Sequence, residues 1–294
     1  MRTPKSPASM CLAIALVLGL AVPASAGDEG KKRARKWYET SEGEMSTGLG
    51  FDVPIIGNSA GFLGGLGVGY NIWKYVDASI GWSFAVDENG DSCPGNLTLG
   101  LTLFYFSENG KGTTPAWDFN TGLSINAGLG FTDISGLGST HAAEVGRAVN
   151  MGWLYFMTES AVVKPDFFFS LHGPGFSVGT GIGYYAAAPL FDQDVREMLT
   201  ALQYRFGISI YLFGDQRGGL SASVGFTGLK ELDGEENHNY LVNVGLGLRI
   251  RSIGLRTGFN VGIPMGDETA GVSAVIGFGA SYEFEIYRPA EIGG

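Results

Sequence analysis

Residues 272–286 read VSAVIGFGASYEFEI, and this stretch decides the fold because apolar side chains recur at every second position. The even-numbered positions are apolar or aromatic: Val272, Ala274, Ile276, Phe278, Ala280, Tyr282, Phe284 and Ile286. The odd-numbered positions are mostly small or charged: Ser273, Val275, Gly277, Gly279, Ser281, Glu283 and Glu285. Side chains of a β-strand point to opposite faces in turn, so the stretch predicts a strand with one apolar face. Globular strands usually have only about 5–6 residues.

The same alternation recurs in residues 62–72, 119–131 and 242–250. A soluble β-sandwich also shows this period, but its second face is solvated and carries Lys, Glu and Thr. Here the second face is mainly Gly, Ser and Asn, and Trp or Tyr recurs at strand ends. Long alternating strands flanked by aromatic residues are typical of a transmembrane β-barrel.

Composition supports a β-rich chain. The 294 residues include 48 glycines, which argues against long helices, and no apolar stretch in the predicted mature chain approaches the roughly 18 residues of a membrane-spanning helix. The formal net charge of −10 argues against a nucleic-acid partner, because no basic surface dominates.

The first residues are typical of an export signal. Arg2 and Lys5 precede an apolar stretch, and Pro23-Ala24-Ser25-Ala26 supplies small residues at the cleavage position, so we expect a signal peptide over residues 1–26 that is cleaved after Ala26. A basic periplasmic segment at 27–43, the barrel at 44–287 and a short tail at 288–294 are expected to follow. Cleavage leaves Cys93 as the single thiol, so no intrachain disulfide is expected.

The last strand carries a more specific motif. Gly279-x-x-Tyr282-x-Phe284 resembles the signal by which the assembly machinery recognises bacterial outer-membrane β-barrel proteins, and the resemblance covers about residues 44–287. The sequence departs from that pattern in having Gly277 where a polar residue is usual, and in continuing to Gly294 instead of ending on an aromatic residue. The resemblance implies an antiparallel up-and-down barrel in the outer membrane, with membrane lipids and the barrel assembly machinery as partners.

Connection lengths predict about twelve strands. Short turns near Lys74, 215–217 and Ser252 are expected in the periplasm, and the longer segments 87–94, 132–150, 189–202 and 230–237 outside the cell. The alternation of short and long connections is kept only if 151–175 contributes one strand. The chain then turns either at Lys164-Pro165-Asp166 or at His172-Gly173-Pro174-Gly175. Alternatively, residues 140–161 form a helix within a long loop that folds into the barrel.

Inward-facing charges cluster near the periplasmic end of the predicted barrel. This predicted lumen belt comprises Asp77, Asp118, Arg249, Arg251, Arg256, Glu283 and Glu285. One interpretation is a salt-bridge network that braces the barrel base, because inward charges seek partners where water is restricted. The other is a charged constriction that filters solutes.

Signals for catalysis are sparse. Some twelve-stranded outer-membrane barrels are lipid hydrolases with a Ser and His pair on the outward surface, so Ser170 and His172 are considered, although no third residue is identified to orient them. No metal-ligand spacing or phosphate loop is found, and no cofactor is predicted.

The outer loops are acidic. Carboxylates expected there are Asp87, Glu88, Asp91, Asp192, Asp194, Glu197, Glu231, Asp233, Glu235, Glu236, Asp267 and Glu268. They could bind divalent cations that bridge to lipopolysaccharide, or simply keep the loops soluble.

Taken together, these features predict a passive channel or small-solute transporter of the bacterial outer membrane. A structural or surface-interaction barrel without an open pore is the alternative, and a lipid hydrolase the third hypothesis.

Overall fold

The structure is a computed structural model that describes residues 44–73, 76–109, 118–130, 140–149, 160–173, 175–189, 199–215, 218–232, 238–250, 253–266 and 269–285. All of them belong to one compact unit of the chain, residues 37–294. The predicted signal peptide, the basic segment and the C-terminal tail lie outside the described residues.

Strands dominate the described part of the chain. Its twelve long strands are β1 (Glu44–Ile56), β3 (Phe62–Trp73), β4 (Val76–Val86), β5 (Ser92–Asn109), β6 (Asp118–Gly130), β7 (Ser160–His172), β8 (Phe176–Pro189), β9 (Leu199–Asp215), β10 (Gly218–Glu231), β11 (His238–Ile250), β12 (Leu255–Gly266) and β13 (Val272–Glu285). A two-residue strand, β2 (Ser59–Ala60), and a helix, α2 (Thr140–Val149), complete the described elements.

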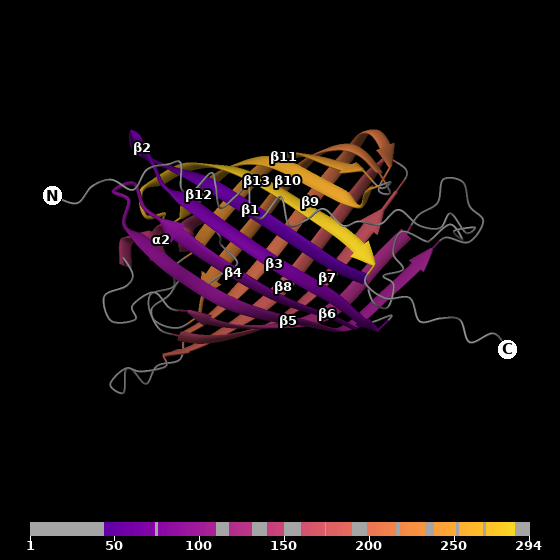
Figure 1. The fold of residues 1–294 in the computed structure, drawn as a ribbon, viewed down its shortest axis with the longest axis horizontal. Helices are drawn as coiled ribbons and strands as arrows, with labels where there is room; N and C mark the ends of the chain where they lie inside the picture. Colours follow the sequence, from indigo (N-terminus) through magenta and orange to yellow (C-terminus); the bar gives the residue numbers. More distant parts are fainter. Residues whose placement is uncertain are drawn as a thin grey trace. The chain divides into compact units, whose positions relative to one another are not determined.

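The sheet closes on itself (Figure 1). Each long strand pairs antiparallel with the next one along the chain, and β13 pairs with β1 from Glu44↔Glu285 to Ile56↔Val272. Closure satisfies the backbone hydrogen bonds of every strand without leaving an edge, as a sheet surrounded by hydrocarbon requires. The prediction of an all-β, up-and-down antiparallel barrel with twelve strands is confirmed.

The structure also decides between the alternatives for 151–175. Among the described residues of this segment, 160–173 and 175, there is one strand, β7, and the chain reverses between His172 and Phe176, where Gly173 N–H donates to the Phe176 carbonyl at 2.8 Å. A turn at Lys164-Pro165-Asp166 is wrong, because Lys164 and Asp166 pair with Asn126 and Ser124 in the middle of β6.

Alternation along each strand separates an outer face from a lumen face. Large apolar side chains on the outer face remain exposed in the isolated chain, for example Leu246 at 49% and Ile276 at 41%. A soluble protein rarely exposes so extensive an apolar surface, whereas hydrocarbon tails would cover it in a membrane.

The two ends of the barrel differ in their connections. At one end of the barrel, β1 is followed by β2 and β4 is followed by the 87–91 turn. We call this end the loop end. At the opposite turn end, β13 finishes, and only two residues separate β3 from β4 and β9 from β10.

Helix α2 lies at the loop end, inside the barrel wall. Its side chains Ala142, Val145, Ala148 and Val149 form one buried cluster with Leu63, Ala85, Cys93, Val272 and Val275. Leu63, Ala85 and Val275 occupy lumen positions of their strands, so the helix packs on the inner wall. The prediction of a helical segment that folds inward is therefore correct for 140–149, while β7 already begins at Ser160. In the described part of the chain, no helix has the length and apolarity needed to cross a membrane.

Candidate functional site

A charged cluster that the sequence interpretation missed lies on the lumen face of β7 and β9. Asp166 accepts from two cations: Arg205 Nη2 lies 2.7 Å from its Oδ2, and Lys164 Nζ lies 3.3 Å from the same oxygen. Lys164 also donates to Gln203 Oε1 at 2.5 Å, and its ammonium lies 4.9 Å from the ring centroid of Tyr185. We call these five residues the lumen cation cluster.

Burial differs sharply among the charged members. The side chains of Lys164 and Asp166 are only 8% and 5% exposed, whereas that of Arg205 is 39% exposed. Two cations share one carboxylate, so the three groups carry a formal charge of +1. Because Asp166 holds only part of a guanidinium with five N–H donors, Arg205 can offer the others to a solute in the lumen.

Two glycines on β8 make room for the cations. A Cβ on Gly183 would lie 2.6 Å from Lys164 Cε, and one on Gly181 would lie 2.8 Å from Arg205 Nη2. Both glycines occupy lumen positions beside these strands, Gly183 opposite Asp166 and Gly181 opposite Arg205. The small residues on this part of the inner face therefore leave room for the two charged side chains.

Below the cluster, toward the turn end, the wall of β7–β10 forms a hollow of about 400 Å³. Its polar lumen side chains are Ser170, His172, Ser177, Arg205, Ser209 and Thr227, and Gly179, Gly207 and Gly225 also line it. The hollow thus combines one cation, several hydroxyls and an imidazole with a glycine-rich wall. Such groups can bind a small anionic solute that also carries hydrogen-bonding atoms.

The Ser170 and His172 pair belongs to this hollow. Ser170 Oγ lies 3.2 Å from His172 Nε2, so the two side chains are within hydrogen-bond reach. They share the face of the buried Lys164 and Asp166, while Phe167 and Phe169 on the other face are exposed. The pair therefore faces the lumen, not the outward surface that the lipid-hydrolase hypothesis requires.

The opposite wall is lined differently. A second hollow, of about 820 Å³, runs along β1, β3, β4, β5, β12 and β13, and its lumen positions are mainly Gly and Ser with Asp52 among them. β1 and β8 are the first and seventh of twelve long strands in the ring, so Asp52 and the lumen cation cluster lie on opposite sides.

The described members of the predicted lumen belt form two groups at the turn end. Arg249 Nη2 lies 3.6 Å from Glu283 Oε2, and Arg256 forms an ion pair with the same carboxylate. On the other side of β1, Asn71 Nδ2 donates to Asp77 between β3 and β4. Arg251 and the side chains of Asp118 and Glu285 lie outside the described residues.

The residues of the predicted assembly signal lie on β13. The rings of Tyr282 and Phe284 stack with centroids 5.7 Å apart and an interplanar angle of 29°. Gly279 occupies a lumen position opposite Gly50 of β1. On the outer face near the loop end, Tyr204, Phe226 and Tyr240 form a row with centroids 6.0 and 5.7 Å apart, as expected of an aromatic girdle.

Comparisons with known proteins agree with this architecture. No protein-family model and no curated protein sequence matches the chain. Among solved structures, the COG4313 outer membrane channel from Pseudomonas putida F1 has a TM-score of 0.54 at 10% identity, covering 88% of this chain and 100% of that one. The NanC porin gives 0.49 at 9% identity, covering 81% and 98%. The chain therefore has the fold of the bacterial outer-membrane β-barrels.

Proposed function

We propose that the protein is a passive channel of the bacterial outer membrane that conducts small anionic solutes, such as carboxylates, through its lumen. The observation that carries the proposal is Arg205, held by Asp166 on the lumen wall with its guanidinium exposed beside a hollow lined with hydroxyls. Fixed cations at the narrow part of a pore favour anions. The assignment of the protein to the outer membrane rests on the exposed apolar side chains of the outer face and on the fold.

Several further contacts support a binding role for Arg205. Lys164 also forms an ion pair with Asp166, so this carboxylate has a cationic partner besides Arg205. Gly181 lets the guanidinium lie against the backbone of β8, which fixes its position without filling the hollow. A cation that is positioned and exposed in this way can act on a passing anion at little entropic cost.

The experiment is a reversal-potential measurement in planar bilayers under a salt gradient. Arg205→Gln removes the exposed lumen cation and should shift the reversal potential toward cation preference. Lys230→Gln is the matched control, because Lys230 lies on the outer-face positions of β10 near the loop end and the substitution removes the same charge. Equal shifts in the two variants would contradict the assignment of Arg205 to the conduction pathway.

One observation favours the alternative of a barrel without an open pore. Helix α2 fills part of the loop end, and a second buried apolar cluster of Val162, Tyr185, Ala187, Ala201 and Leu229 covers the wall of β7–β10 at the same end. If these clusters together close the barrel, no conductance is expected from the purified protein, and its role would then depend on the surface of its loops.

A further inference from the structure

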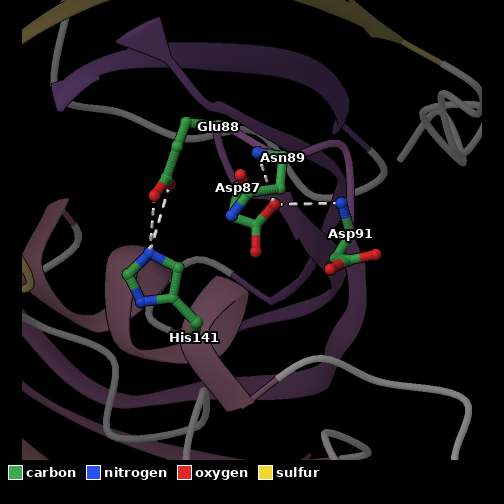
Figure 2. Close-up of polar contacts among 5 residues, drawn as sticks. All are labelled: Asp87, Glu88, Asn89, Asp91 and His141. Atoms are coloured by element: carbon green, nitrogen blue, oxygen red, sulfur yellow. Dashed lines mark hydrogen bonds and ion pairs between the residues drawn. The ribbon is translucent and has the colours of Figure 1, made fainter. Parts of the chain in front are cut away.

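The turn between β4 and β5 and the start of α2 bring two carboxylates and one imidazole together at the loop end (Figure 2). One ligand atom each from Asp87, Glu88 and His141 lies within 4.8 Å of the other two. His141 Nε2 is 3.1 Å from both carboxylate oxygens of Glu88. Glu88 and His141 are 53 positions apart in the sequence, so only the fold creates this group.

Both halves of the group are held in place by their own surroundings. Asp87 is 3% exposed, and its Oδ1 accepts the backbone N–H groups of Asn89 and Asp91 at 2.9 Å each. On the helix, Ala142 and Val145 are fully buried against the inner wall, which fixes the position of His141 at the first turn. The donors thus lie on two segments that are joined by one buried cluster, in which Ala85 and Cys93 flank the turn and Ala142 and Val145 belong to α2.

The donor set indicates which ligand would fit. One imidazole nitrogen and two carboxylate oxygens are ligands that Zn²⁺ and neighbouring first-row transition-metal ions accept, whereas Ca²⁺ and Mg²⁺ prefer oxygen ligands alone. Two donors that each lie about 2.0–2.2 Å from one Zn²⁺ in tetrahedral geometry are about 3.3–3.6 Å apart. The 3.1 Å between Glu88 and His141 is already close to that spacing.

We propose that Asp87, Glu88 and His141 bind one divalent transition-metal ion of the Zn²⁺ type and thereby fasten α2 to the β4–β5 turn. The ion would neutralise two adjacent carboxylates, of which Asp87 is buried, and water would complete its coordination. This site lies at the loop end, apart from the lumen cation cluster on β7 and β9. The proposal stands whether or not the barrel conducts solutes.

The test is calorimetric titration of the purified, chelator-treated full chain with Zn²⁺, together with its melting temperature in detergent. His141→Gln removes the nitrogen ligand but leaves an amide that can still donate to Glu88, so it separates metal binding from hydrogen bonding. Glu88→Gln removes one carboxylate ligand. Asp91→Asn is the matched control, because it removes one negative charge from the same turn, while Figure 2 shows Asp91 on the far side of Asp87 from His141.

We expect one Zn²⁺ per chain and a higher melting temperature with the ion bound. His141→Gln and Glu88→Gln should each weaken binding at least about tenfold, since even the loss of a residue that only hydrogen-bonds to a metal ligand costs that much. Asp91→Asn should change the affinity less than twofold. The absence of saturable binding would overturn the proposal. So would equal binding by His141→Gln and the parent, because the ion would then lie on other acidic loop groups.

Discussion

At the residue scale, Glu283 is the contact point of the turn-end ion pairs. It accepts from Arg249 and Arg256, and these three residues come from three neighbouring strands, β11, β12 and β13. Because the Glu283 side chain is 25% exposed, we place its contribution between those of exposed and buried pairs. The contacts are those expected of a brace that ties adjacent strands together at the barrel base.

Glu283→Gln is therefore expected to lower the free energy of unfolding by about 1–2 kcal/mol. The two arginines then lose their shared anion and repel each other. Urea denaturation in detergent or lipid measures the change, and Asp77→Asn is the control, because an amide can keep a hydrogen bond with Asn71. If Glu283→Gln leaves stability unchanged and alters ion selectivity instead, the belt acts as a filter and the brace interpretation fails.

One residue, Pro165, explains why the sequence interpretation missed the lumen cation cluster. Pro165 lies between Lys164 and Asp166, and since proline cannot donate to a strand ladder it is usual at edges and turns. It therefore makes a mid-strand segment look like a turn. The β7–β8 pairing is interrupted there, running to Val163↔Ala186 and resuming at Asp166↔Gly183. The alternating positions of Lys164 and Asp166 on one face were the available signal.

At the element scale, the strands could be predicted because a membrane barrel imposes period-two alternation on every one of them. The same parity placed Asp77, Arg249, Arg256 and Glu283 on the lumen face, near the turn end where the structure has them. The helix α2 follows no such rule. Its position depends on side chains of five strands, β1, β3, β4, β5 and β13, so sequence alone could leave it only as an alternative.

Leu246→Arg tests the assignment of the two faces. Leu246 is exposed on the outer face near mid-strand, so a charge there would enter hydrocarbon and should reduce stability by about 2–4 kcal/mol. Ser124→Arg, on the lumen face, should cost less, because a charge there meets the polar interior of the barrel and not hydrocarbon. The measurement is the unfolding free energy in lipid vesicles, and equal losses in the two variants would show that the register is wrong.

Val145→Asp tests the packing of α2 against the inner wall of the barrel. Val145 is fully buried in the apolar cluster on the inner wall, and an unpaired carboxylate there should detach the helix. If α2 narrows the loop end, the single-channel conductance of Val145→Asp should exceed that of the parent protein. Ser59→Asp, at an exposed position of β2 at the same end, adds the same charge outside the cluster. Unchanged conductance in Val145→Asp would exclude α2 as an obstruction.

At the scale of the whole molecule, side-chain chemistry changes along the barrel axis. Ion pairs lie at the turn end, and apolar clusters with α2 occupy the loop end. The larger hollow extends from Glu283 of the ion pairs to Leu63 of the apolar cluster, and the smaller one reaches Arg205 of the lumen cation cluster. A scaffold that only had to be stable would be expected to fill its interior with packed side chains. The hollows and the exposed Arg205 are the observations on which we base the proposal of a solute pathway.

Planar-bilayer recording of the purified parent protein under a salt gradient tests this account most directly. We expect discrete conductance steps with a reversal potential on the anion-selective side. The measured selectivity should fall when small carboxylates compete for the lumen cation cluster. A correctly folded barrel that inserts into the bilayer and shows no conductance, or that prefers cations, would contradict it.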